Sequence, residues 1–207
     1  MTVRIWGRAT SINVQKALWL CGEIELSVER VDLGGAFGGL DTADYLAMNP
    51  NGRVPTLQDG DLILWESNAI LRHLARTRAP HLLGGSDAER AQVDMWLDWQ
   101  QTTLWAQLRP LFRALVRPGP DTAMSTSDAA AATQAVTAAM TALERRLDAR
   151  AFILGGGFSL PDVAIGLCAH RWLNLELSRP DTPAVRRWYD AITARRAFQA
   201  LAPPPLS

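Results

Sequence analysis

Ser11 and Asn13 are the first side chains in the chain whose type and position could do chemistry. They lie in GRATSINVQK (residues 7–16), a small polar cluster directly before an apolar-periodic run. A hydroxyl and an amide at the start of a helix either cap that helix or donate hydrogen bonds to an anion held at its N-terminus. Lys16, the only lysine of the chain, lies about one turn inside the same helix, and we expect it to be structural.

Two further segments offer groups that suit a peptide-like ligand. In NPNGRVP (residues 49–55), a cis Val54-Pro55 bond would leave the Val54 N–H and C=O free to pair with an extended peptide. The alternative is an ordinary trans proline at the start of a strand. In WES (residues 65–67), Ser67 opens a helix whose amides favour a carboxylate, and Glu66 can receive an ammonium. The pair therefore suits an α-amino-carboxylate, unless Ser67 only caps the helix.

The elements that position these segments alternate between strand and helix. VRIW (residues 3–6) and SVERVDL (27–33) predict strands on either side of a helix. Apolar side chains at helical spacing form one face of that helix: Val14, Ala17, Leu18 and Cys21. VPTLQDGDLILWE (54–66) predicts a hairpin around Asp59-Gly60, and a helix follows from Ser67. The order is a βαβ unit, an irregular loop and a ββα unit.

The irregular loop LGGAFGGLD (residues 33–41) is rich in glycine. It is not expected to cradle a phosphate, because no strong helix pattern opens at its end and no Gly-Lys-Ser/Thr follows. A surface loop is the simpler interpretation.

From Arg78 onward no strand signal occurs. Residues 78–86 form a Pro/Gly linker, and residues 87–207 predict an all-α domain. Its first helix extends over residues 87–116, with a bend expected at Pro110. In FSLPDV (158–163), Ser159 and Asp162 fit a capping box, so we interpret Asp162 as structural and not catalytic.

Composition excludes several classes of partner. The formal net charge is zero, so no basic field indicates nucleic acid or an anionic membrane. The N-terminus carries no leader pattern and no apolar run is long enough to span a bilayer, so we expect a cytoplasmic protein. Cys21 and Cys168 lie far apart within apolar patterns, which predicts two buried, reduced thiols and no metal site.

The motifs in this order resemble the cytosolic glutathione S-transferase family over nearly the whole chain. The similarity rests on S-x-N-x-x-K, NPNGRVPTL, LWESNAILRHL and, in the helical part, FSLPDVAIG. Bacterial theta-like and nu-like members are the most similar. The resemblance implies a thioredoxin-like domain (βαβ-ββα) over residues 1–77, an all-helical domain over 87–207, glutathione as co-substrate without a metal, and a homodimer.

The resemblance also implies roles for single residues in binding glutathione. Pro55 would be cis, and the Val54 backbone would pair with the cysteinyl part of glutathione. Glu66 and Ser67 would hold the γ-glutamyl head, and Arg53 lies where the family often places a basic contact to the glycyl end. The glycine-rich loop before Asp41 departs from the family because it has no clear polar counterpart.

Ser11 matches the serine of theta-like enzymes and the threonine of nu-like ones, and Asn13 matches the nu-like asparagine. Theta-like enzymes usually carry proline at the position of Asn13, so the class assignment is mixed. We expect Ser11 to be the main donor to the glutathione thiolate, with Asn13 second. No general base is needed, so we interpret the histidines as surface or core residues: His73, His81 and His170.

The expected activity is detoxifying transfer of glutathione to an apolar electrophile. In the helical domain, side chains at helical spacing are candidate walls of the electrophile site, with core packing as the alternative: Trp105, Leu108 and Phe112. Glutathione-dependent disulfide or peroxide reduction is the runner-up, favoured if Asn13 dominates. A non-catalytic glutathione-binding module is a third possibility, which the presence of Ser11, Glu66 and Ser67 disfavours.

Overall fold

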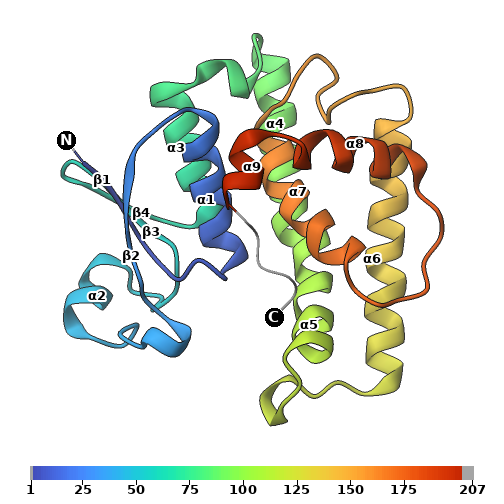
Figure 1. Ribbon diagram of the computed structural model, residues 1–207, viewed down its shortest axis with the longest axis horizontal. Coiled ribbons are helices and arrows are strands. Elements are labelled where there is room, and N and C mark those ends of the chain that lie inside the picture. The colour runs from blue at the N-terminus through green and yellow to red at the C-terminus, as the bar shows by residue number, and fades with distance from the viewer. Residues whose placement is uncertain (1, 202–207) are drawn as a thin grey trace. The chain divides into compact units, whose positions relative to one another are not determined.

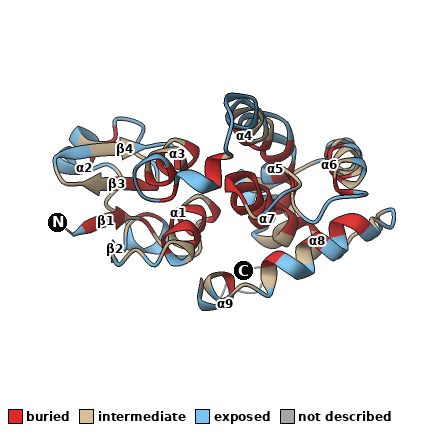
Figure 2. Cartoon of the chain, turned by 90° about the horizontal axis from the view of Figure 1, so that it is seen from above, coloured by how far each residue is buried: buried red, intermediate tan, exposed pale blue. Residues whose placement is uncertain are grey.

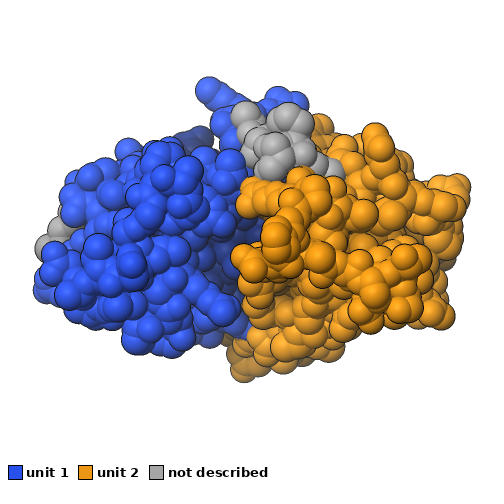
Figure 3. All heavy atoms as spheres, turned by 90° about the horizontal axis from the view of Figure 1, so that it is seen from below, with its two compact units in different colours: residues 1–83, 195–203 blue, residues 84–194, 204–207 orange. Residues whose placement is uncertain are grey.

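The computed structural model describes residues 2–201, which belong to two compact units (Figure 3). Unit 1 contains residues 1–83 together with a C-terminal segment that begins at Arg195. Unit 2 contains residues 84–194. The sequence predicted one helical domain over residues 87–207. The structure differs, because the segment from Arg195 packs with unit 1. Residues 202–207 of that expected domain lie outside the described residues.

A four-stranded mixed sheet forms the centre of unit 1 (Figure 1). Its strands are β1 (Val3–Trp6), β2 (Val28–Val31), β3 (Thr56–Asp59) and β4 (Leu62–Trp65), in the order β2-β1-β3-β4. β1 pairs with β2 in parallel, whereas β3 pairs antiparallel with both β1 and β4. The predicted βαβ-ββα arrangement is confirmed.

The register of the sheet brings the ends of three strands to one edge. Trp6 at the end of β1 lies opposite Thr56 at the start of β3, and Thr56 lies opposite Trp65 at the end of β4. The antiparallel pairing puts the end of one strand beside the start of the next. The segment that precedes β3 and the segments that follow β1 and β4 therefore leave the sheet at the same end of the strands. We call this end the shared edge of β1, β3 and β4.

Helix α1 (Ile12–Glu23) packs against α3 (Ser67–Arg78) and also against α9 (Arg196–Leu201). The Trp19 and Phe198 rings meet edge to face, with centroids 4.8 Å apart. Arg195 binds Glu23 through both carboxylate oxygens, at 2.9 and 2.6 Å. An aromatic contact and a bidentate ion pair thus hold the C-terminal segment on α1.

The segment between β2 and β3 was expected to be irregular throughout, and this is wrong in part because it contains two helical segments. A 3₁₀ turn covers Gly35–Phe37, and α2 covers Ala43–Met48. Thr42 caps α2 by accepting a hydrogen bond from the Tyr45 N–H at 3.4 Å. Tyr45 is the only buried residue of α2, so the helix has no apolar periodicity that a sequence pattern could reveal.

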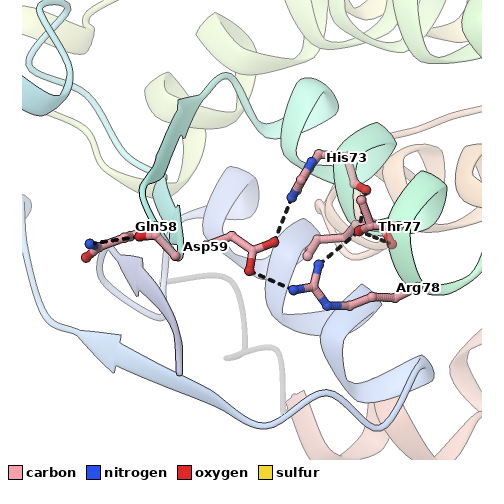
Figure 4. A network of polar contacts seen from close by, with 7 residues as sticks. Gln58, Asp59, His73, Thr77 and Arg78 are labelled. Atoms are coloured by element: carbon pink, nitrogen blue, oxygen red, sulfur yellow. Dashed lines mark hydrogen bonds and ion pairs between the residues drawn. The ribbon is translucent and has the colours of Figure 1, made fainter. Parts of the chain in front are cut away.

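The predicted hairpin is present, and Gly60 provides its turn with a φ of 64°. Figure 4 shows how Asp59 in this hairpin is tied to α3. One carboxylate oxygen lies 2.7 Å from His73 Nε2, and the other accepts a hydrogen bond from Arg78 Nη2 at 2.7 Å. The hydrogen bond from Arg78 lowers the pKa of Asp59 below its usual 3.8, and the bond from His73 acts in the same direction.

Unit 2 contains the helices α4 (Asp87–Trp99), α5 (Trp105–Val116), α6 (Thr126–Leu147), α7 (Leu160–Leu173) and α8 (Pro183–Thr193). Short 3₁₀ turns cover Pro80–Leu83, in unit 1, and Pro120–Thr122. The helical fold expected here is confirmed. Within residues 2–201, no helix has the length and apolar character needed to cross a bilayer.

The helical pattern changes before Pro110, at a segment that the sequence did not indicate, and a bend at the proline itself stays a prediction. A π-helical segment, Gln100–Leu104, separates α4 from α5, and the Trp105 N–H there bonds to the Gln100 carbonyl. α5 continues through Pro110, which is exposed. Proline removes only one hydrogen bond of the helix, whereas a π turn changes the bonding along its whole length.

The capping box at the start of α7 is confirmed. Asp162 accepts hydrogen bonds from the Ser159 N–H at 2.9 Å and the Ser159 hydroxyl at 2.6 Å. It also accepts from the Ile153 N–H at 3.0 Å and Trp188 Nε1 at 2.8 Å. Burial raises the pKa of the Asp162 carboxyl, and these donors act in the opposite direction. We call Asp162 and its three partners, Ser159, Ile153 and Trp188, the Asp162 cluster. The helix that begins here, α7, is buried along most of its length (Figure 2).

Candidate functional site

Ser11 occupies the N-cap position of α1, but its side chain makes no hydrogen bond to that helix. Its backbone carries the local structure, since its N–H donates to the Arg8 carbonyl at 3.1 Å and its carbonyl accepts from the Gln15 N–H at 2.9 Å. The side chain is half-buried. The hydroxyl is therefore not used for capping, which was the simpler interpretation of this residue.

Gly7 brings Val54 against the segment that leads to Ser11. Its φ is +149°, and a Cβ at this position would lie 2.4 Å from Val14 Cγ2 and 3.0 Å from Val54 Cβ. A side chain would not fit between these two valines. Glycine at the end of β1 thus permits the close packing of α1, β1 and the chain before β3.

The Val54-Pro55 peptide bond is cis, as predicted. The preceding Arg53 carbonyl accepts hydrogen bonds from the Tyr45 hydroxyl at 2.6 Å and from Asn49 Nδ2 at 2.7 Å. Both side chains also contact Thr56 Oγ1, at 2.9 and 3.1 Å. Burial raises the pKa of Tyr45, so its hydroxyl keeps the proton it donates.

Sequence reasoning missed this anchor of the segment around Val54. Asn49 opens the NPNG sequence and could have indicated a polar turn. Tyr45 and Thr56 had no such signal, because their contacts come from a helix that the sequence did not predict. The Arg53 side chain itself is exposed.

Glu66 is exposed and has a positive φ of 68°. Such a backbone is uncommon outside glycine, and where it occurs in a structure it often marks a functional site. Ser67 is the first residue of α3 and not its cap, so the alternative in which it only caps the helix is wrong. The Ser67 hydroxyl instead donates to Asn13 Oδ1 at 3.3 Å.

Lys16 is fully buried and is hydrogen-bonded to the same Ser67 hydroxyl. Its Nζ donates to Ser67 Oγ at 3.3 Å and to Asn68 Oδ1 at 3.2 Å. The contacts join the start of α1 to the first turn of α3. We call Asn13, Lys16, Ser67 and Asn68 the Ser67 cluster; the sequence pointed to Asn13 and Ser67 for chemistry, treated Lys16 as structural and gave no signal for Asn68.

The candidate walls of an electrophile site lie on α5 in unit 2. Trp105, Leu108 and Phe112 are all buried, at 7%, 0% and 3% exposure. The Arg171 guanidinium lies over the Trp105 ring at 5.6 Å and the Phe112 ring at 4.2 Å. These contacts are packing within unit 2, and a role in binding an electrophile stays a prediction.

Two histidines and both cysteines, which were not expected to take part in the chemistry, have structural surroundings within unit 1 or unit 2. His73 contacts Asp59, and His170 Nδ1 lies 2.8 Å from the Tyr189 hydroxyl. Cys21 and Cys168 are buried free thiols, as predicted, and burial raises the pKa of Cys21 to about 12. Among residues 2–201, no three His, Cys, Asp or Glu side chains gather as metal ligands would.

Comparison with known proteins assigns both parts of the chain. Residues 1–76 match the family described as glutathione S-transferase, N-terminal domain, and residues 126–191 match glutathione S-transferase, C-terminal domain. The chain is 36% identical to glutathione S-transferase GstB of Escherichia coli K12, over 99% of this chain and 100% of the relative.

The chain belongs to the glutathione S-transferase family. Among solved structures, the theta class glutathione S-transferase of Xanthomonas axonopodis pv. citri with glutathione bound superposes with a TM-score of 0.93. It is 39% identical and covers 100% of this chain and 99% of its own. Glutathione S-transferase 3 of Zea mays is 31% identical over 99% of this chain and 98% of its own length. The predicted family, its fold and the similarity to theta-class bacterial members are confirmed.

Proposed function

We propose that this member of the glutathione S-transferase family binds glutathione at the shared edge of β1, β3 and β4 and joins its sulfur to an apolar electrophile, with Ser11 stabilising the thiolate. The observation that carries the proposal is the Ser11 hydroxyl, which sits at the N-cap of α1 without bonding to that helix. The glutathione-bound theta-class relative supports glutathione as the ligand.

Each part of glutathione has a counterpart at this edge. The Val54 backbone pairs with the cysteinyl residue as a strand would, next to the cis bond. Glu66 receives the γ-glutamyl ammonium, while Ser67 and the start of α3 receive its carboxylate. Arg53 is exposed and can reach the glycyl carboxylate. The recognition needs no metal.

A single hydroxyl is sufficient for the chemistry. A free thiol has a pKa of about 8.5 and is only a few per cent thiolate at pH 7. Half ionisation at pH 7 needs a shift of roughly 1.5 units, or about 2 kcal/mol. One hydrogen bond to a charged acceptor contributes roughly 1.5–3 kcal/mol. Ser11, aided by the N-terminus of α1, can supply that amount without a general base.

The second candidate function is reduction of disulfides or peroxides by glutathione. It is favoured by the position of Asn13, which is half-buried, lies two residues from Ser11 and carries an amide Nδ2 that can donate to a thiolate. If Asn13 and not Ser11 is the main thiolate donor, the protein resembles nu-like enzymes in chemistry as well as in this residue.

The deciding experiment compares Ser11→Ala and Asn13→Ala. Each variant is assayed with a chloronitrobenzene electrophile and with a small disulfide, and the absorbance of bound glutathione thiolate is titrated. We expect Ser11→Ala to lower kcat/KM for the electrophile by roughly 10- to 100-fold and to raise the thiol pKa. Binding of S-methylglutathione, which has no thiol, should change little.

Ser125→Ala is the matched control, because Ser125 is also a serine N-cap, on α6 in unit 2. It should leave both assays unchanged. Unchanged turnover and thiol pKa in Ser11→Ala would refute the mechanism. Loss of disulfide turnover in Asn13→Ala alone would favour the reductase. Binding of glutathione without either turnover would support the non-catalytic module.

The electrophile and the assembly are part of the same proposal. An apolar electrophile would pack near Trp105, Leu108 and Phe112, so Phe112→Ala should change KM for the electrophile more than KM for glutathione. The family resemblance also implies a homodimer in the cytoplasm. Light scattering of the purified protein tests the dimer, and a mass of about 23 kDa, that of one 22.7 kDa chain, would contradict it.

A further inference from the structure

Lys16 is the only lysine of the chain, and it stands at a fully buried position. A buried cation is costly unless hydrogen bonds and charges compensate it. Its Nζ reaches two successive residues of α3, Ser67 at 3.3 Å and Asn68 at 3.2 Å. The ammonium is therefore held beneath the first turn of α3, where the proposed function puts the glutamyl carboxylate.

The directions of the hydrogen bonds in the Ser67 cluster follow from its chemistry. An ammonium only donates, so Ser67 Oγ accepts from Lys16. The Ser67 proton is then free to be donated, and it points to Asn13 Oδ1 at 3.3 Å. Lys16 thus fixes which way the Ser67 hydroxyl faces, and through it the orientation of the Asn13 amide.

We propose that Lys16 is a positioning residue that makes the site at Ser67 selective for a carboxylate. This rests on the proposed function. When the glutamyl carboxylate arrives, the Ser67 proton turns from Asn13 Oδ1 to a carboxylate oxygen, while Lys16 continues to donate to Ser67 Oγ. The charge of Lys16 lies one hydrogen bond behind that contact. Burial strengthens its attraction for the carboxylate, because water does not screen it.

A purely structural role is the competing explanation. In that case Lys16 only joins α1 to α3 through Ser67 and Asn68, and its loss would weaken every ligand alike. Selectivity for the carboxylate separates the two explanations, because only a charge that acts on the ligand distinguishes a carboxylate from its amide.

The test uses the full chain and two probes, glutathione and a glutathione analogue whose glutamyl α-carboxylate is a primary amide. Dissociation constants are measured by calorimetry for wild type, Lys16→Met and Lys16→Arg, with Gln15→Met as the control for a buried polar head group on α1. We expect Lys16→Met to weaken glutathione binding by roughly 10- to 100-fold and amide binding by less than about threefold. Lys16→Arg should keep the preference for the carboxylate.

A double variant checks that Lys16 acts through Ser67. If it does, the two losses are not multiplied, and Lys16→Met weakens glutathione binding by a smaller factor in Ser67→Ala than in wild type. Equal losses for both probes, no loss, or multiplied losses in the double variant would overturn the proposal. If Lys16→Met does not fold, Lys16→Gln and the wild-type preference for carboxylate over amide decide in the same way.

The proposed function can fail separately from this inference. If the wild-type protein does not bind glutathione, the proposed function is wrong, and with it the premise of the role of Lys16. Suppose instead that wild type binds glutathione, and Ser67→Ala more weakly, as proposed. If the dissociation constants of Lys16→Met and Gln15→Met are then equal, only the role of Lys16 is wrong.

Discussion

The Asp162 cluster of unit 2 and the Ser67 cluster of unit 1 are both buried polar groups next to the first turn of a helix. Asp162 is fully buried and accepts four hydrogen bonds, all from groups of its own unit. The Ser67 cluster begins at a fully buried residue, Lys16, but ends at Asn13, which is half-buried and lies two residues from Ser11.

The difference lies in where the hydrogen bonds end. A carboxylate with four donors from its own chain has little capacity left for a ligand, so the Asp162 cluster stabilises the fold. In the Ser67 cluster the hydrogen bonds run from buried Lys16 through Ser67 to half-buried Asn13, and Ser67 directly follows Glu66, which is exposed and has a φ of 68°. Polar groups that are buried at one end and accessible at the other are suited to binding.

The largest expected effect is the loss of stability when the Asp162 cluster is disrupted. Asp162→Ala leaves several donors buried without an acceptor, and we expect a loss of roughly 3–5 kcal/mol in the free energy of unfolding, measured in urea. Asp128→Ala is the matched control, because Asp128 also pairs with an N-cap serine, Ser125, but is exposed. It should cost less than about 1 kcal/mol. Equal losses in the two variants would show that burial does not decide the contribution.

Ser67→Ala should behave in the opposite way. It removes the hydroxyl that the proposed function assigns to the glutamyl carboxylate, so glutathione binding should weaken by roughly 10- to 100-fold. We expect the free energy of unfolding to fall by roughly 1.5–3 kcal/mol, less than for Asp162→Ala, because the buried Lys16 ammonium loses one of its acceptors and Asn13 loses a donor. A calorimetric titration with a denaturation curve on the same sample checks both. A loss confined to stability would place the Ser67 cluster with the Asp162 cluster.

Tyr45→Phe addresses an intermediate case, the anchor behind Val54. The hydroxyl binds the Arg53 carbonyl and Thr56 Oγ1, and its loss leaves Asn49 to hold both. We expect a loss of roughly 1–2 kcal/mol in stability and a severalfold rise in KM for glutathione, with kcat nearly unchanged. Tyr189→Phe, in unit 2, is the control, and it should not change KM. A change confined to kcat would contradict a positioning role for Tyr45.

The sequence predicted the elements whose signals are local. The apolar face of α1, the Asp-Gly turn and the capping box of α7 each depend on residues within a few positions of one another. α2 was missed because Tyr45 is its only buried residue, and the π-helical segment Gln100–Leu104 had no proline or glycine to indicate it.

The candidate site was predictable in its parts and not in its connections. Ser11, Asn13 and Ser67 were found from residue types at the starts of helices, and the family resemblance supplied the cis bond at Pro55. The contact of Lys16 with Ser67 joins residues 51 positions apart, so no sequence spacing reveals it. Asn68 had no signal for the same reason.

The smallest expected effect concerns a third polar network, in which Asp59 joins β3 to α3 through His73 and Arg78. It belongs to neither the Asp162 cluster nor the Ser67 cluster. Arg78 lowers the pKa of Asp59 below 3.8, so the folded state favours the charged form. The resulting stability is present above pH 3.8 and is lost as the pH falls through the lower pKa of the folded state. Asp59→Asn should therefore lower the free energy of unfolding by roughly 1 kcal/mol at pH 7 and by a smaller amount as the pH falls below 3.8. Urea denaturation from pH 7 to 3 measures this, with the exposed Asp61→Asn as control. A difference that stays constant to pH 3 would mean that the Asp59 side chain contributes through its packing and not through its charge.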